Sequence, residues 1–387
     1  MKTMKRLPQP TRSVSRRRFL GATTTAVTAF SLVPRYVLGG AKFVPPSEQV
    51  NIGLIGAGGQ GRTNSRELFR QPDARIIALA DPNVQADYSR YHYQGTAGRA
   101  PVRGEIEKAH GESAPNFKCG EYEDFRVMLE KEKAIDAVLI ATPDHVHAYA
   151  SITCMKQGKH VYCEKPLTHN VWEARQVAKV ARETGVATQM GNQGHSGEGI
   201  RTTCEWIWDG AIGTVREVHA WSDAGRWIPH TGRPQGTPPV PSGFNWDLWL
   251  GPRESRPYHP EYAPYNWRGW WAFAAGVDGE VLGGGGNGIL FVGEQGKIMA
   301  GGWDGTPRIL PQARMDSYQR PAKSLPRSKG HHRDWLDACK GGPPASANFE
   351  YGARLTEIVL LGNVALRTGK RIHWGPVGHE GNQRTRS

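Results

Sequence analysis

The chain has 387 residues, of which 38% are hydrophobic and 22% charged, a composition typical of a folded globular protein rather than a disordered one. Its formal net charge is +13, but residues 1–40 hold eight lysines and arginines and no acid, which leaves +5 on the remaining 347 residues. That remainder has no basic patch interleaved with aromatic residues and no recognised nucleic-acid motif. A nucleic-acid partner is therefore excluded.

Residues 1–40 are predicted to be an export signal. The pair Arg16-Arg17 is followed by a mildly apolar run over residues 21–33 that is too short to span a bilayer. A basic segment with twin arginines before a short apolar run is typical of twin-arginine export. We expect a periplasmic protein without a membrane span, or a membrane-tethered one if the leader is retained, because no clear cleavage site follows. A disordered basic leader is the alternative.

The five cysteines do not predict a metal site. They form no C-x-x-C pair, and their number is odd, so neither zinc ligation nor a redox motif is indicated. One disulfide in an oxidising compartment remains open, and the spacing does not say which residues would form it.

A dinucleotide site is predicted where the leader ends. Residues 50–55 are expected to form a strand, residues 62–70 a helix, and residues 74–80 a second strand. Between the first strand and the helix lies a G-x-G-x-x-G turn, in which glycines allow a tight turn, close approach to a pyrophosphate and close packing of helix on strand. The predicted cofactor-binding residues of this unit are Gly56, Ala57, Gly58, Gln60, Gly61 and Asp81.

Asp81 favours NAD over NADP as the cofactor. It follows the second strand, where a carboxylate can accept hydrogen bonds from ribose hydroxyls and would repel a 2′-phosphate. The next residues are Pro82, Asn83 and Val84, so no arginine follows directly to bind such a phosphate.

The alternation of strands and helices continues to about residue 190. Helices are expected at residues 124–131, 148–157 and 171–184, and strands at residues 134–141 and 160–163. This order predicts an α/β Rossmann domain over residues 48–190, with a doubly wound parallel sheet. Ligands of such sheets lie at the carboxyl ends of the strands, so we expect the segments after the strands to form the site.

These segments resemble the Gfo/Idh/MocA family of oxidoreductases. The resemblance rests on the glycine turn with Asp81, Thr142-Pro143 with two histidines, Glu164-Lys165-Pro166, Gly191-Asn192, and the tryptophan-rich stretches 246–252 and 266–271. It implies that Lys165 is the catalytic or nicotinamide-side lysine and that the bond before Pro166 is cis. It further implies that the cofactor is contacted by Thr142, Pro143, His147, Glu164, Lys165 and Asn192.

The chemistry of the residues supports a catalytic role for Lys165. Oxidation of a sugar alcohol needs a hydride acceptor and a group that takes the hydroxyl proton, and a lysine with a lowered pKa can serve. The alternative is a surface lysine paired with Glu164. His145, His147 and His195 are candidates for orienting substrate or shuttling protons, but histidines at strand ends are also often structural.

Residues 191–376 are predicted to form an α+β substrate domain with a mostly antiparallel sheet, followed by a tail over residues 377–387. A strand is expected at residues 215–222, and two helices at residues 331–340 and 353–367. Nine of the 13 tryptophans lie between Trp206 and Trp271. Aromatic faces suit sugar rings, although tryptophans that simply fill a core are an equally good interpretation.

The second domain differs from the family pattern near residues 274–288. The resemblance implies an aspartate and an acid/base histidine shortly after Phe273, yet no histidine occurs between His259 and His331. An internal deletion is therefore predicted, and it affects catalysis rather than cofactor binding.

The leading prediction is an NAD(P)-dependent oxidoreductase that acts on a sugar, polyol or glycoside by hydride transfer. Its catalytic residues would be Lys165 with His145, His147 or His195 in place of the absent histidine. The alternatives are a non-catalytic nucleotide-binding relative and an NAD-dependent glycoside-cleaving enzyme. The predicted partner is a small carbohydrate, and the resemblance adds a possible homo-oligomer.

Overall fold

The computed structural model describes residues 44–221, 232–275, 287–302 and 305–373. The chain divides into one unit of residues 1–45 and a second of residues 46–387, and the following concerns the second. The predicted export signal and most of the predicted shortened segment lie outside the described residues. In the part of the chain that is described, no helix is both long and apolar enough to cross a membrane.

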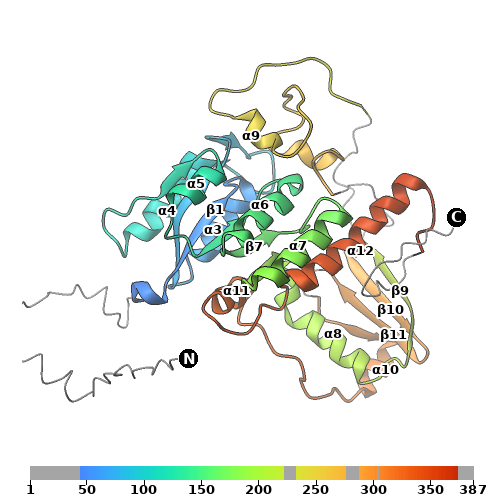
Figure 1. The fold of residues 1–387 in the computed structure, drawn as a ribbon. Coiled ribbons are helices and arrows are strands. Elements are labelled where there is room, and N and C mark those ends of the chain that lie inside the picture. Colours follow the sequence, from blue (N-terminus) through green and yellow to red (C-terminus); the bar gives the residue numbers. More distant parts are fainter. Residues whose placement is uncertain (1–43, 222–231, 276–286, 303–304, 374–387) are drawn as a thin grey trace, which may run out of the picture. The chain divides into compact units, whose positions relative to one another are not determined.

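A six-stranded parallel sheet forms the first half of this unit, as predicted (Figure 1). All its neighbouring strands pair in parallel. In spatial order the strands are β5 (Gly120–Tyr122), β2 (Ala74–Ala80), β1 (Val50–Ile55), β6 (Ala137–Ile140), β7 (His160–Glu164) and β8 (Thr188–Gly191).

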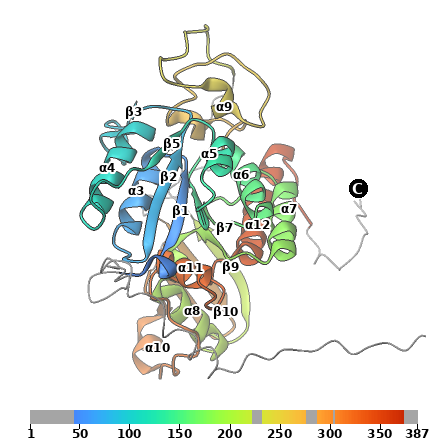
Figure 2. The same ribbon diagram turned by 60° about the vertical axis from the view of Figure 1, so that its left-hand side comes forward.

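Helices cover both faces of this sheet because its strands are apolar on both sides (Figure 2). In β1, Ile52 and Leu54 face one layer, whereas Ile55 faces the other. The first layer contains α3 (Gly59–Leu68), α4 (Arg99–Gly111) and α11 (His331–Cys339). The second contains α5 (Phe125–Lys131), α6 (Asp144–Lys156), α7 (Val171–Thr184) and α12 (Phe349–Thr368). The helices α11 and α12 thus return from the end of the chain to the first domain.

Most predicted elements are present, with two informative differences. The strand at 74–80 and the helix at 171–184 have the predicted bounds. Helix α6 begins at Asp144 rather than at residue 148, because the extended Pro143 precedes it and an acidic residue occupies its first turn. Helix α4 was not predicted, since Gly104 and Gly111 weaken its helical pattern.

The second domain contains the predicted antiparallel sheet. Four strands run in the order β12 (Arg308–Leu310), β11 (Gly296–Gly301), β10 (Gly288–Gly293) and β9 (Val215–Trp221), and every pair is antiparallel. Helix α8 (Glu198–Trp208) packs on it through Trp206. Short α10 (Gln312–Ser317) follows β12. Together with the Rossmann sheet, this confirms the predicted fold class.

Residues 244–275 form a separate aromatic core, which we call the aromatic cap. It includes α9 (Trp246–Leu250) and the 3-10 turn η3 (Asn266–Gly269), drawn in yellow to orange in Figure 1. Its buried rings pack on one another, as Trp246 does on Trp249 with 4.8 Å between ring centroids. Most tryptophans of the cap are therefore buried in its core.

Backbone hydrogen bonds connect the beginning of the aromatic cap to the loop after β2. The Val84 backbone N–H donates to the Gly243 carbonyl at 2.8 Å, and the Asn245 N–H donates to the Pro82 carbonyl at 2.9 Å. The cap also meets α6, where the Ala275 N–H donates to the Asp144 carboxylate at 2.8 Å. The cap is thereby held over the carboxyl ends of the strands.

Candidate active site

A cavity of about 580 Å³ lies between these strand ends and the aromatic cap. Its lining follows the carboxyl ends of four parallel strands, as the sequence predicts for a doubly wound sheet. The predicted residues that line it are Gly56, Gly58, Gln60, Asp81, Thr142, Pro143, His147, Glu164 and Lys165. The cap contributes Leu248, Trp249, Trp267 and Arg268.

The glycine turn packs so closely on its neighbours that residues with a Cβ would not fit at two of its positions. Gly56 has a φ of +88°, and a Cβ there would lie 2.7 Å from the Ala141 carbonyl oxygen. A Cβ on Gly61 would overlap the Gly56 carbonyl oxygen, so only glycine allows α3 to pack this closely. Helix α3 begins at Gly59, and its N-terminal N–H groups are suited to a pyrophosphate. The turn therefore fits a dinucleotide.

Asp81 lies at the end of β2 and holds the glycine turn. Its carboxylate accepts hydrogen bonds from the backbone N–H groups of Ala57 at 2.7 Å and Asn83 at 2.8 Å. Burial raises the pKa of Asp81 to about 6, against the effect of these N–H donors. Ala57 does not itself line the cavity, and its backbone N–H is bound to Asp81.

Glu164 connects the end of β7 to α3. Its carboxylate is only 5% exposed and accepts hydrogen bonds from Asn64 at 2.8 Å, Gln193 at 3.1 Å and Gln60 at 3.2 Å. Burial raises the pKa of Glu164, while these amide donors favour the carboxylate. Gln60 therefore has a structural partner, and Glu164 fixes the start of α3 beside the cavity.

Lys165 projects from the end of β7 into the same cavity. Its side chain is exposed, and the peptide bond between Lys165 and Pro166 is cis, as the family resemblance implies. The alternative reading, an ion pair with Glu164, is not seen among the described residues, where Glu164 is held by amides instead. The lysine is thus placed where a ligand can reach it.

His145 and His195 lie outside the cavity, which corrects the prediction that they act on substrate. His145 is 1% exposed, and its Nε2 is 3.0 Å from the Trp249 carbonyl oxygen. Burial lowers the pKa of His145 to about 3, so its ring is neutral. The His195 ring packs on Tyr351 with centroids 4.5 Å apart, and burial lowers its pKa as well. Neither histidine therefore lines the space that a substrate would occupy.

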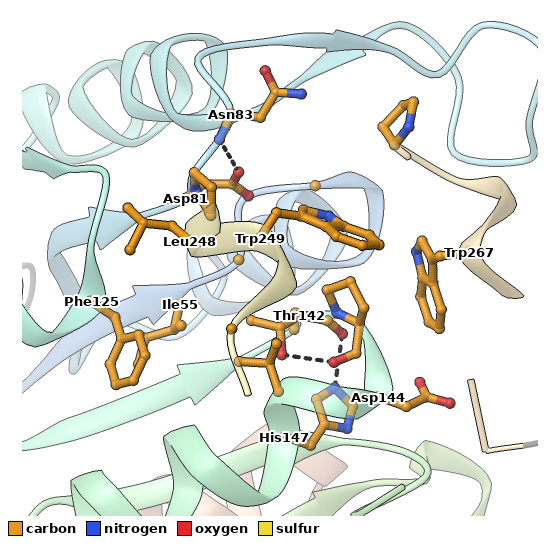
Figure 3. Close-up of a pocket in the computed structure, with 18 of the residues that line it drawn as sticks. Ile55, Asp81, Asn83, Phe125, Thr142, Asp144, His147, Leu248, Trp249 and Trp267 are labelled. Atoms are coloured by element: carbon orange, nitrogen blue, oxygen red, sulfur yellow. Dashed lines mark hydrogen bonds between the residues drawn. The ribbon is translucent and has the colours of Figure 1, made fainter. Parts of the chain in front are cut away.

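His147 connects the segments that follow β6 and β7. Its Nδ1 lies 2.7 Å from the Pro166 carbonyl oxygen, and its Nε2 lies 2.8 Å from the Thr142 carbonyl oxygen (Figure 3). Two carbonyl acceptors require an N–H on both nitrogens, so the ring is an imidazolium. Burial opposes this charge, but Cys163, Asp144 and the carbonyls raise the pKa of His147 to about 10. His147 therefore positions Pro166, and with it Lys165, rather than offering a free nitrogen to a cofactor.

This charged histidine predicts a pH-dependent stability. The pKa of His147 in the folded protein lies above its ordinary value of about 6.5. Its stabilisation of the fold is therefore complete below about pH 6.5 and is lost as the pH rises through about 10. The free energy of unfolding should fall by up to about 1.4 kcal/mol per pH unit within this window. Urea unfolding of the wild type and of His147→Gln at several pH values measures this slope. Equal slopes in the two proteins would contradict the assignment.

Asn192 differs most from its predicted cofactor role. It does not line the cavity, and its buried Oδ1 has no hydrogen-bond partner within the described residues. Gly61 does not line the cavity either, and its contribution is to allow the close packing of α3 on β1.

Three groups of the cavity were not predicted. Asp144 follows Pro143 directly, and an acid at the start of a helix after a strand was the signal that could have identified it. Trp249 and Trp267 line the cavity from the cap, although the sequence did not separate them from the core tryptophans. Arg268 lies beside Trp267, with its guanidinium carbon 4.2 Å from the ring centroid.

Comparison with known proteins agrees with this geometry. Residues 50–192 match the family model GFO_IDH_MocA, described as "Oxidoreductase family, NAD-binding Rossmann fold". The inositol 2-dehydrogenase of Rubrobacter xylanophilus is 32% identical over 140 residues, which cover 36% of this chain and 33% of the relative. The levoglucosan dehydrogenase of Pseudarthrobacter phenanthrenivorans is 25% identical over 179 residues, which cover 43% of this chain and 39% of the relative. The matches thus span well under half of these relatives.

Two solved structures share the fold over most of the chain. An NAD-binding protein from Listeria innocua has a TM-score of 0.52 at 17% identity, over 84% of this chain and 97% of the other. The WlbA dehydrogenase of Bordetella pertussis, solved with NADH and UDP-GlcNAcA, has a TM-score of 0.51 at 18% identity, over 84% of this chain and 99% of the other. At these identities the likeness concerns the fold. Residues 50–192 therefore match the model of the Gfo/Idh/MocA oxidoreductase family, and the structure of this segment is an NAD-binding type of Rossmann fold.

Proposed function

We propose that this protein is an NAD-dependent oxidoreductase that oxidises an alcohol group of a sugar or polyol. The observation that carries the proposal is the position of Lys165, which lines the same cavity as the glycine turn and the Asp81 carboxylate. When bound, NAD supplies the hydride acceptor, and the chain must bind it, exclude water and manage one proton. The exposed Lys165 amine is placed to contact the reacting hydroxyl.

The dinucleotide would be held by three parts of the cavity. The start of α3 faces the pyrophosphate, Asp81 faces the adenosine ribose, and Lys165 marks the nicotinamide end. NAD is preferred to NADP in this proposal, because the buried Asp81 would repel a 2′-phosphate. Arg126 also lines the cavity, but it is paired with Asp124 at 2.6 Å.

A carbohydrate fits the cap side of the cavity. Trp249 and Trp267 contribute apolar surface to this side of the cavity for the C–H groups of a sugar ring, and Asp144 and Arg268 contribute polar partners for hydroxyls. The dehydrogenases that resemble residues 50–192 are named for inositol and levoglucosan, which agrees with a polyhydroxylated ring as substrate.

The test is reduction of NAD by polyols. Purified full-length protein is incubated with NAD or NADP and with myo-inositol, levoglucosan, glucose, glucuronate or a methyl glucoside, and nicotinamide absorbance is followed. We expect NAD reduction by at least one compound and weaker reduction of NADP. Binding of NAD without its reduction by any of a broad panel of polyols would favour a non-catalytic relative. The absence of the expected histidine is the reason to consider this alternative. Hydrolysis of the methyl glucoside without net NADH would favour the glycoside-cleaving alternative.

We further propose that the protein is exported through its twin-arginine leader. The support is the Arg16-Arg17 pair with the short apolar run that follows it. Cell fractionation should find the protein outside the cytoplasm, and replacement of both arginines by lysine should retain it inside. Cytoplasmic recovery of the unaltered chain would contradict export.

We also propose the internal deletion and a homo-oligomer. The first is supported by the absence of histidine from residues 260–330. The second is supported only by the family resemblance, and the mass of the protein in solution decides it.

A further inference from the structure

We propose that the Asp144 carboxylate is the proton-transfer partner of Lys165, in the role for which the chain lacks the expected histidine. This inference rests on the proposed function and names a residue that completes its site. Asp144 is the first residue of α6 and lines the cavity together with Lys165.

The carboxylate of Asp144 is held rigidly and still faces the cavity. Its Oδ2 accepts the backbone N–H of Ala275 at 2.8 Å, which fixes the side chain against the aromatic cap. Among the described residues no hydrogen bond to its other oxygen, Oδ1, is found, and Asp144 lines the cavity. Figure 3 shows the carboxylate on the side of the cavity where Trp267 lies.

Three cations act on this carboxylate from three different elements. They are His147 on α6, Lys165 after β7 and Arg268 in η3, and each lowers the pKa of Asp144. The side chain is only 7% exposed, however, and burial outweighs the cations so that the pKa is raised. A buried carboxylate with a raised pKa is a better proton acceptor than an exposed one.

Three other titratable groups of the cavity, His147, Glu164 and Tyr93, already have other roles or protonation states. His147 already carries a proton on both nitrogens, which bond backbone carbonyls. Glu164 accepts hydrogen bonds from three amides at Oε1 and thereby holds the start of α3. Burial raises the pKa of Tyr93, so this phenol stays protonated and cannot take up a second proton.

The proposed step balances as follows. As the hydroxyl O–H bond of the substrate breaks, its proton goes to Asp144 Oδ1. Lys165 meanwhile donates a hydrogen bond to the substrate oxygen. The C–H bond breaks with its electron pair, which leaves as hydride to the oxidised nicotinamide dinucleotide, and a carbonyl forms. The substrate thus loses one hydride, which carries the two electrons, and one proton. Asp144 then releases the proton to solvent.

The test compares Asp144→Asn with the wild type, because asparagine can still accept the hydrogen bond from Ala275. With the polyol that the wild type oxidises, kcat/KM should fall by about 100-fold or more. Affinity for NAD, measured by isothermal titration, should change by less than about twofold. The control Asp316→Asn changes an exposed carboxylate on α10 and should retain wild-type rates.

A second measurement separates proton transfer from a structural effect. Alcohol oxidation by the wild type should decline as the pH falls through the raised pKa of Asp144, and this acidic limb should be missing from Asp144→Asn. Infrared spectra of the NAD-bound protein should show a protonated carboxyl band that titrates above the ordinary range of aspartate and is absent from the variant.

The outcomes distinguish this inference from the proposed function. If the wild type reduces no NAD with any polyol, the proposed function fails. If the wild type is active and Asp144→Asn keeps its rate and its acidic limb, the inference is overturned.

Discussion

Replacement of Lys165 by methionine is expected to lower kcat for polyol oxidation by about 10²- to 10⁴-fold. The physical reason is that the amine lines the cavity at the end of β7, while the fold around it is held by other groups. Methionine keeps the length and apolar stem of the side chain but removes the group that contacts the reacting oxygen. Because no ion pair of Lys165 is found within the described residues, its loss should not destabilise the protein.

The measurement has two parts and a matched control. Steady-state kinetics give kcat, and isothermal titration gives the affinity for NAD, which should stay within about fivefold of the wild type. Lys179→Met removes an exposed lysine on α7, away from the cavity, and should change neither value. A Lys165→Met variant with wild-type kcat would refute the role proposed for this lysine.

Replacement of Gly56 by valine is expected to abolish NAD binding, with a loss of affinity of at least about 100-fold. Gly56 adopts a φ of +88°, which costs a residue with a Cβ about 1–2 kcal/mol. The new Cβ would in addition lie 2.7 Å from the Ala141 carbonyl oxygen, which belongs to the backbone after β6 and cannot yield easily. The turn must therefore move away from the position that accepts the pyrophosphate.

A second glycine separates the two effects. Gly158 also has a positive φ, +74°, but a Cβ there would have no neighbour within 4 Å. Gly158→Val should thus lower the melting temperature through backbone strain and leave NAD binding intact. If both variants bind NAD equally well, the glycine turn does not hold the dinucleotide.

The sequence predicted the Rossmann domain well because its signals are local. The run Ala74–Ala80 and the helix at Val171–Thr184 carry their own periodicity, and the glycine turn has conformational needs that only glycine meets. Cofactor-side residues such as Asp81 follow from their position at a strand end. The strand at 215–222 was likewise visible from alternation, whereas β10, β11 and β12 were not predicted.

The catalytic side depends on contacts between distant residues, which local patterns do not contain. His145 and His147 are two positions apart on α6, yet one packs against the Trp249 carbonyl and the other bridges Thr142 and Pro166. Burial and partners, not residue type, decide that the first is neutral and the second charged. The same holds for Trp249 and Trp267, which reach the cavity only because the cap folds over the sheet.

The central claim is that one cavity holds both the dinucleotide and the carbohydrate, with Lys165 at their junction. A crystal structure of the full-length protein with NAD and a polyol that it oxidises tests this most directly. We expect the pyrophosphate at the glycine turn, the adenosine ribose at Asp81, and the polyol hydroxyl within hydrogen-bond distance of both Lys165 and Asp144. A nucleotide bound elsewhere, or a polyol that contacts neither side chain, would contradict it.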